Sequence, residues 1–485
     1  MDFSSFGLGD LTVSDSDWEA TPQSVRNLLG ALAQKIVALQ EQTLVLQAKI
    51  ETLEEKLNTN SRNSGRPASS DPPGGLPSRG KSNPENKKQG GQPGHPGNSR
   101  PAFAATEVDK IVDQNPSHCS GCGYCLADIE PSNYLPHQVT ELPEKLMFVI
   151  EYRLHSKICR CGEVNKGELP DGVSQRKFGP RLMSAVAMLS GTYHMSRRDI
   201  VDFLCKVLDI EMSLGSVSSI EGLVTTTLES ARGDLEEAIQ NEDCLNMDDT
   251  GWRKNNKYAC LWVATSPNLT LFKITPDKKA DTAKAILGRF QGILTSDRAK
   301  NLDFFSGYRQ TCWAHLDRHF KRISERKGLS AQVGLDAMKI NDNVFVIWRQ
   351  FLAGQLDHEG LLDALQPERD RLHAILTRGA TCKNPKTENT CQNILDMFTN
   401  LWTFAYLEGV EPTNNAAERQ LRDGVMWRKT CYGSQSDRGN RFAESMLSVN
   451  ATCRQQGVSI RKFLEQTILA FFKGIPGPTL RPAPA

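Results

Sequence analysis

Apolar residues recur at alternating steps of three and four early in the chain, between positions 29 and 57. Gln, Glu and Lys surround them, so the apolar stripe is narrow. Such a stripe is typical of the a and d positions of a coiled coil, and an amphipathic helix packed on its own protein is the alternative. The pattern predicts a self-associating helical segment over residues 1–58. The stripe consists of Leu29, Leu32, Ile36, Leu39, Thr43, Leu46, Ile50, Leu53 and Leu57.

Residues 59–107 lose this periodicity and are rich in Asn, Ser, Gly and Pro, with more basic than acidic side chains. A segment of this composition cannot bury enough apolar surface to offset the entropy lost on ordering. We therefore expect a disordered basic linker. Its positive charge suits contacts with phosphate groups, and a linker that contacts only solvent is the alternative.

Two cysteine motifs within residues 108–170 predict a structural zinc module. Cys119 and Cys122 form Cys-x-x-Cys followed by Gly, and Cys159 and Cys161 form Cys-x-Cys. Residues 145–155 have a strand-forming pattern, and two such cysteine turns joined by a hairpin bind one zinc ion tetrahedrally. A set of free thiols is the alternative. The short second motif leaves three substitute ligands open: Cys125, His118 and His155.

Residues 171–240 carry helical patterns separated by turns that contain Gly and Ser. The spacing suits a helix-turn-helix whose last helix, starting near residue 213, would enter a DNA groove. Ordinary helix packing is the alternative, and no base-reading residue can be named. We expect a helical region that binds DNA if the helix-turn-helix interpretation holds.

From residue 241 the pattern changes to strands, and this region continues to residue 475, before a Pro-rich tail at 476–485. Three strands, a crossover helix and two more strands predict a mixed α/β sheet. Residues from about 321 to 408 have helical patterns instead. We interpret them as a helical insertion, because unstructured loops of that length are uncommon in compact domains. The expected strands lie at 243–248, 258–265, 269–275, 292–297 and around 310.

Three carboxylates stand at informative places in this region. Asp248 lies in the first strand, Asp297 ends the fourth, and Glu418 lies on the helix after the insertion. The first and fourth strands are expected to be neighbours, which would bring the two aspartates together. Magnesium prefers oxygen ligands, and a few carboxylates can hold two ions about 3.5–4 Å apart across a phosphodiester. The trio predicts phosphoryl transfer on nucleic acid.

Each acid also has an ordinary interpretation. Asn415 and Glu418 have the spacing of a capping box, and Glu418 with Arg422 has the spacing of a helical ion pair. Asp248 and Asp297 have the alternative of being strand-end carboxylates that face solvent, and Asp249 competes with Asp248 for the catalytic role. The joint order of the three acids favours catalysis, because structural context confirms a motif.

Four motifs together resemble the insertion sequence 66 family of bacterial DDE transposases. The resemblance runs nearly from end to end, because the coiled coil, the Asn-rich linker, the cysteine module and the core stand in the family's order. Two departures are Asp249, where relatives usually carry Glu, and the sequence Asp-Arg-Ala-Lys from position 297. The motifs are the acidic trio, Cys312-Trp-Ala-His315, Asn414-Asn-Ala-Ala-Glu418-Arg and Gly433-Ser-Gln-Ser-Asp-Arg-Gly439.

The resemblance implies a ribonuclease-H-like catalytic core with two Mg²⁺ or Mn²⁺ ions per active site, held by Asp248, Asp297 and Glu418. One structural Zn²⁺ would be held by the four cysteines. It also implies binding to the terminal inverted repeats of a mobile element, strand cleavage, and joining of the freed 3′ hydroxyl to target DNA. A nuclease of the same fold that does not join strands, and an inactive DNA-binding remnant, are the alternatives.

The implied partners are double-stranded DNA of the element ends and target, and at least one more copy of the chain when two ends are paired. Small accessory proteins of the same element are further candidates. Guanidinium groups bind phosphate bidentately, so basic residues on the Glu418 helix predict DNA contacts, with surface salt bridges as the alternative. These residues are Arg419, Arg422, Arg428 and Lys429. Two other residues, His315 and Asn415, are predicted to support the active site.

The overall charge points to no partner, because 58 Lys and Arg nearly balance 57 Asp and Glu over 485 residues. DNA binding must then come from local patches.

The first residues lack a signal-peptide pattern, and no stretch reaches the roughly 20 apolar residues that cross a bilayer. We therefore expect no membrane contact and a bacterial cytoplasmic protein, associated with the nucleoid when bound to DNA. The 13 cysteines suit metal binding and reduced thiols better than disulfides.

Overall fold

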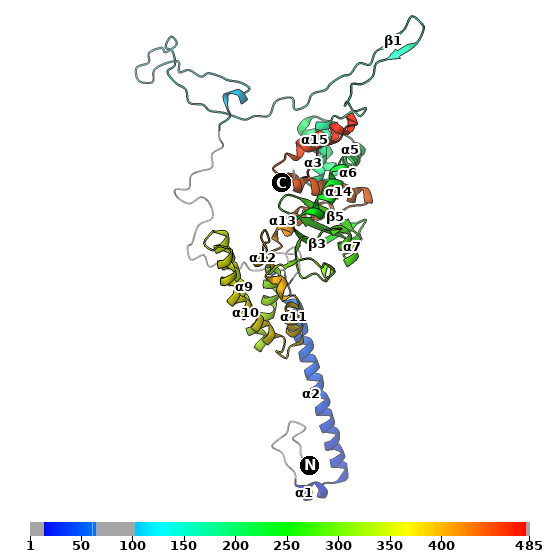
Figure 1. Cartoon of the computed structure of the whole chain (residues 1–485), viewed down its shortest axis with the longest axis vertical. Helices are drawn as coiled ribbons and strands as arrows, with labels where there is room; N and C mark the ends of the chain where they lie inside the picture. Colours follow the sequence, from blue (N-terminus) through cyan, green and yellow to red (C-terminus); the bar gives the residue numbers. More distant parts are fainter. Residues whose placement is uncertain (1–13, 61, 65–101, 482–485) are drawn as a thin grey trace. The chain divides into compact units, whose positions relative to one another are not determined.

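The structure is a computed structural model that describes residues 14–60, 62–64 and 102–481 (Figure 1). The chain divides into two compact units. The first contains the described residues up to 64 together with 243–248 and 291–416, and the second contains 102–242, 249–290 and 417–481. In the described part of the chain, no helix has the length and apolar character needed to cross a membrane.

The N-terminal part of the first unit is a short helix, α1 (Asp15–Ala20), followed by α2 (Gln23–Leu57), which Figure 1 shows as one unbroken helix. The helix therefore covers the whole apolar stripe predicted from the sequence. The stripe residues are exposed, for example Leu39 at 54% and Leu53 at 50%. Self-association through this stripe remains a prediction.

A folded turn follows α2 at the start of the predicted linker. Asn63 is buried, and its amide donates to the Asn58 carbonyl at 2.8 Å and to Glu325 Oε2 at 2.6 Å. Ser64 donates to the Asn60 carbonyl at 2.6 Å. The first residues of the predicted linker are thus attached to the first unit, whereas residues 65–101 lie outside the described residues.

The sheet has the strand order β5-β4-β3-β6-β7. β3 is parallel to β6, and β6 is parallel to β7, whereas β4 and β5 are antiparallel. Asn255 and Asn256 join β3 to β4 with positive φ, as a two-residue hairpin turn requires. The predicted order of three strands, a helix and two strands is confirmed. The elements are β3 (Cys244–Lys254), β4 (Lys257–Thr265), β5 (Thr270–Thr275), α7 (Ala280–Leu287), β6 (Ile293–Ser296), η5 (Lys300–Leu302) and β7 (Arg309–Thr311).

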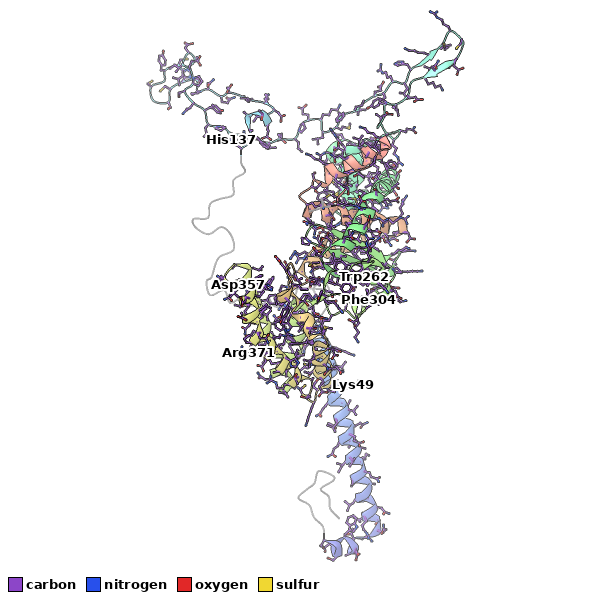
Figure 2. The ribbon with its side chains drawn as sticks, viewed as in Figure 1. Lys49, His137, Trp262, Phe304, Asp357 and Arg371 are labelled. Carbon is purple, nitrogen blue, oxygen red and sulfur yellow. The ribbon has the colours of Figure 1, made fainter. Side chains whose placement is uncertain are left out.

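The helical part of the first unit packs around aromatic side chains. The Trp313 and Trp402 rings lie 5.0 Å apart, and Trp313 Nε1 donates to the Leu401 carbonyl at 2.7 Å. Asp357, labelled in Figure 2, caps α10 by accepting the Gly360 N–H at 2.8 Å. The elements are α8 (Trp313–Ser324), α9 (Gly328–Leu352), α10 (His358–Gly379), α11 (Pro385–Leu395), η6 (Phe398–Leu401) and α12 (Thr403–Tyr406).

Gly334 allows α8 and α9 to pack closely, and replacing it by Ala is expected to destabilise the protein. An added Cβ would lie 2.2 Å from the Ser324 backbone nitrogen and 2.7 Å from the Phe320 carbonyl oxygen. Backbone atoms cannot move aside as a side chain does, so we expect a loss of about 2–3 kcal/mol in the free energy of unfolding, measured by denaturant titration. Gly233→Ala is the matched control, because Gly233 has open space around it in α6 (Glu229–Ala238). Equal stability of both variants would contradict the packing argument.

In the second unit, α14 covers the outer edge of β5. Side chains of Glu444, Ser448 and Thr452, spaced one turn apart, accept the N–H groups of Ile274, Phe272 and Thr270. An exposed sheet edge can pair with other chains, and α14 removes that risk here. The other helices of this unit are α3 (Pro180–Gly191), α4 (Arg197–Leu208), α5 (Leu214–Thr227), α6, η4 (Ile239–Asn241), α13 (Asn415–Cys431), α14 (Asp437–Gln455) and α15 (Ile460–Lys473).

The helix predicted to enter a DNA groove, α5, is a core helix of this unit. Its buried residues include Val217, Ile220, Glu221 and Val224, and it packs against α3, α4, α14 and α15. Other α5 residues, Ser219 and Thr226 among them, are exposed. The helix-turn-helix interpretation therefore stays a prediction, beside ordinary helix packing.

Residues 102–170 are largely extended and exposed. They contain the 3₁₀ turn η3 (Ala105–Glu107) and a two-stranded hairpin of β1 (Ser156–Ile158) and β2 (Val164–Lys166). The strands predicted within residues 145–155 do not form, and the hairpin begins just after them. The second cysteine motif lies in the turn of this hairpin.

Candidate active site

Two of the predicted acids lie at the same end of neighbouring parallel strands. Asn246 on β3 pairs with Thr295 on β6, and Asp248 lies two residues further along β3, whereas Asp297 lies two residues beyond Thr295, directly after β6 ends at Ser296. Adjacent strands of a sheet are about 4.8 Å apart. The predicted proximity of the two strands is confirmed.

The Asp297 carboxylate is held by the chain that follows it. Its Oδ1 accepts the Ala299 N–H at 2.9 Å, which fixes the turn after β6. The unusual Asp-Arg-Ala-Lys sequence is thus accommodated by a short-range side-chain turn. Neighbouring Arg298 is half-buried, and burial lowers the pKa of this guanidinium despite the charge of Asp297.

Asp249 lies next to Asp248 in β3 but has different partners. Cys260 Sγ donates to Asp249 Oδ2 at 3.4 Å, and Lys278 Nζ lies 3.8 Å from the same oxygen. Burial and the Asp249 charge raise the pKa of the Cys260 thiol, which therefore stays protonated. Adjacent residues of a strand point to opposite faces of a sheet. Asp248 and Asp249 thus face different surroundings, and Asp248 is the one in register with Asp297.

Asn414 ties the start of α13 to β3 beside Asp248. Its side chain is fully buried and donates to the Met247 carbonyl at 3.0 Å, and the Asn246 amide donates to Asn414 Oδ1 at 3.2 Å. Its backbone N–H lies 3.2 Å from Cys312 Sγ. α13 begins at Asn415, and Glu418 lies in its first turn. The predicted supporting residue Asn415 is half-buried, and the anchoring residue is the neighbouring Asn414.

Helix α8 brings histidines and arginines next to this region. Cys312 and Trp313 are fully buried, as expected for core residues, and His315 lies in the first turn of the helix. One turn later, burial lowers the pKa of His319 to about 3, and nearby cations, Arg298 first among them, add to the effect. His319 is therefore neutral at physiological pH.

Each cysteine motif forms a turn of its own. Cys119 donates its N–H to the Tyr124 carbonyl at 2.8 Å, and Cys159 donates to the Glu163 carbonyl at 2.8 Å. Backbone N–H groups of Gly121 and Cys122 lower the pKa of the Cys119 thiol, and that of Cys161 lowers the pKa of the Cys159 thiol. Both turns therefore favour the thiolate form, which is the form that binds metals.

Across the described residues, no three side chains of His, Cys, Asp or Glu are close enough together to hold a metal ion. The structure thus brings Asp248 and Asp297 to the same end of two neighbouring strands, but it gathers neither the four cysteines nor a complete group of three acids among the described residues.

A family model described as "Transposase IS66 family" matches residues 175–441, which is more than half of the chain. The chain belongs to the IS66 transposase family. The match includes both aspartates, Asn414 and Glu418. A second model, described as a family of unknown function (DUF6444), matches residues 19–101, where α2 and the predicted linker lie.

Two relatives come from the bacterium Sinorhizobium fredii and are named as uncharacterized proteins. The chain is 24% identical to the uncharacterized protein y4hP over 404 residues, which cover 75% of this chain and 72% of the relative. It is 24% identical to y4qI over 232 residues, which cover 44% of this chain and 42% of the relative.

The basic residues on α13 of this transposase divide into two groups. Arg419, Arg422 and Lys429 are exposed on one face of the helix, since their spacing of three and seven residues repeats over whole turns. Arg428 is half-buried instead, and its guanidinium donates to the Gly251 carbonyl and lies 3.4 Å from Thr250 Oγ1. Arg428 therefore connects α13 to β3, and its phosphate contact stays a prediction.

Proposed function

We propose that this transposase cleaves DNA at the ends of a mobile element and joins the freed ends to a target, by a DDE mechanism. The observation that carries the proposal is the parallel pairing of β3 and β6, because Asp248 lies in β3 and Asp297 directly follows β6, each two residues beyond the paired Asn246 and Thr295. Asn414 supports it, because this residue attaches the helix that carries Glu418 to β3 beside Asp248. The order β5-β4-β3-β6-β7 supports a ribonuclease-H-like core.

The three acids are proposed to hold two Mg²⁺ or Mn²⁺ ions per active site. Carboxylate oxygens are the ligands that these hard cations prefer, so the donor set fits. When bound, such ions lower the pKa of a water and stabilise the oxygen that leaves the phosphorus. The hydrogen bond from Ala299 to Asp297 keeps one of these carboxylates oriented before any ion arrives.

The exposed face of α13 is proposed to bind the DNA backbone. Arg419, Arg422 and Lys429 follow Glu418 on the same helix, so phosphate contacts along it would direct a strand toward the acids. After cleavage, the freed 3′ hydroxyl attacks a target phosphodiester in line and forms a new bond to phosphorus, while the bond from that phosphorus to the target strand's own 3′ oxygen breaks and this oxygen leaves, without a covalent protein–DNA intermediate. Pairing two element ends requires at least two copies of the chain, and the exposed stripe of α2 is proposed to join them as a coiled coil.

The proposal is tested by incubating the purified protein with labelled duplex that carries the terminal repeat flanking its gene. We expect nicking at the repeat end in the presence of Mg²⁺ or Mn²⁺ and none in EDTA. Cleavage that persists in EDTA would reject a metal-dependent mechanism.

We also propose that Cys119, Cys122, Cys159 and Cys161 bind one structural zinc ion and thereby bring the two turns together. Metal analysis of the purified protein should give about one zinc per chain, and Cys119→Ser or Cys159→Ser should remove most of it. Cys205→Ser is the matched control, because Cys205 is an exposed thiol on α4. An unchanged zinc content in both motif variants would contradict the site.

A further inference from the structure

Two exposed tyrosines lie at the C-terminal end of α13. Cys431, the last residue of the helix, donates its thiol to the His194 carbonyl at 3.4 Å, and the His194 ring lies 5.2 Å from the Trp427 ring. These contacts hold the loop after α3 against the end of α13. The residues beside the contact are Tyr193, 63% exposed, and Tyr432, 75% exposed.

The backbone at this place is unusual on both segments. His194 has φ of 56° and Tyr432 has φ of 58°, both in the left-handed region that bulky L-residues rarely adopt. Such conformations persist only where the surroundings enforce them, and they gather at functional sites. Asn or Gly at position 432, the first residue after α13, would relieve the strain.

The loop after Tyr432 explains how this conformation is enforced. A Cβ on Gly433 would lie 2.2 Å from the Arg253 carbonyl oxygen, so only glycine fits there. Ser434 donates its N–H to that carbonyl at 2.9 Å, its own carbonyl accepts the Asn255 N–H at 2.8 Å, and its hydroxyl lies 3.2 Å from Trp252 Nε1. The family motif that begins at Gly433 thus fixes the chain to the β3–β4 hairpin and leaves the Tyr432 ring in solvent.

The position of Tyr432 fits a DNA strand that runs along α13. Tyr432 follows Lys429, the last exposed cation of the α13 face that begins with Arg419. Fourteen residues separate it from Glu418, which is about 21 Å at 1.5 Å per residue. At 3.4 Å per nucleotide, this distance corresponds to about six nucleotides from the cleaved phosphate.

We propose that Tyr193 and Tyr432 form a stacking site for unpaired nucleobases of the DNA strand held along α13, about six nucleotides from the cleavage point. Exposed aromatic rings beside a row of cations are the combination that binds unstacked bases, because every base offers a π-face and every phosphate a charge. This proposal rests on the proposed function, because it requires DNA to lie along α13. It adds a second point of contact with that DNA.

The test compares two labelled duplexes of the terminal repeat in EDTA, by fluorescence anisotropy. One is fully paired, and the other has three unpaired nucleotides about six positions from the repeat end. Wild-type protein should bind the second duplex about ten-fold more tightly, as expected for stacking on one or two bases. Tyr432→Asn and Tyr193→Ala should lose this preference, and Tyr432→Phe should keep it, because the ring and not the hydroxyl stacks.

Tyr432→Asn introduces a residue that tolerates positive φ, so the melting temperature of this variant should equal or exceed that of the wild type. Tyr134→Ala is the matched control, since Tyr134 is exposed in the extended segment. Equal binding of both duplexes by the wild type, or an unchanged preference in both tyrosine variants, would overturn the proposal. The assay contains no metal, so its outcome is independent of whether Asp248, Asp297 and Glu418 cleave DNA.

Discussion

Asp248→Asn, Asp297→Asn and Glu418→Gln should each lower metal-dependent strand cleavage by about 10³-fold or more, which is about 4 kcal/mol of transition-state stabilisation. Each amide keeps the size of the side chain but removes the negative charge that a divalent cation requires. Initial rates of nicking on labelled duplex would measure the effect. Binding to the same duplex in EDTA should stay within a few-fold of wild type.

The matched control for these variants is Asp249→Asn. Asp249 interacts with Cys260 and Lys278, and it is not in register with Asp297. We expect Asp249→Asn to cleave at a rate near that of the wild type. If Asp249→Asn lost cleavage while Asp248→Asn kept it, the first acid would have to be reassigned.

Asn414→Ala should weaken both the fold and the reaction. The change leaves the buried Met247 carbonyl without its side-chain donor, which costs about 1–3 kcal/mol in the free energy of unfolding. It also releases the start of α13 from β3, and a displacement of about 1 Å in a catalytic group can cost about 10²-fold in rate. Denaturant titration and nicking rates would measure the two effects.

Asn415→Ala is the control for this prediction, because Asn415 is half-buried and begins α13. It should change stability and cleavage much less than Asn414→Ala does. Wild-type stability together with wild-type cleavage in Asn414→Ala would show that the connection to β3 has no role in positioning the helix.

The sheet was predictable because its signals are local. Apolar runs marked β3, β4, β5 and β6, and the order of strands and helix restricted the topology, so Asp248 and Asp297 could be placed on neighbouring strands. The anchor of α13 was not predictable in the same way. Two adjacent asparagines look alike in sequence, and the capping-box spacing favours Asn415. Burial of Asn414 depends on how α13 meets β3 and Cys312, which no local pattern encodes.

The surroundings of α5 and of Arg428 were not predictable for a related reason. A helix-turn-helix and an ordinary helical bundle share the same spacing, so the packing of α5 against α14 and α15 could not be deduced from it. Arg428 stands among exposed cations in sequence, yet helix geometry turns it toward Gly251. The helix α2 was predictable from its period, whereas its partner cannot be deduced from one chain.

The most direct test of the proposed transposition chemistry measures joining. Wild-type protein and Asp297→Asn are incubated with Mg²⁺, labelled terminal-repeat duplex and a target plasmid, and the labelled plasmid product is quantified. The DDE proposal predicts joined product with the wild type and none with Asp297→Asn. Joined product at wild-type levels with Asp297→Asn would contradict it, and cleavage without joining by the wild type would identify a nuclease instead.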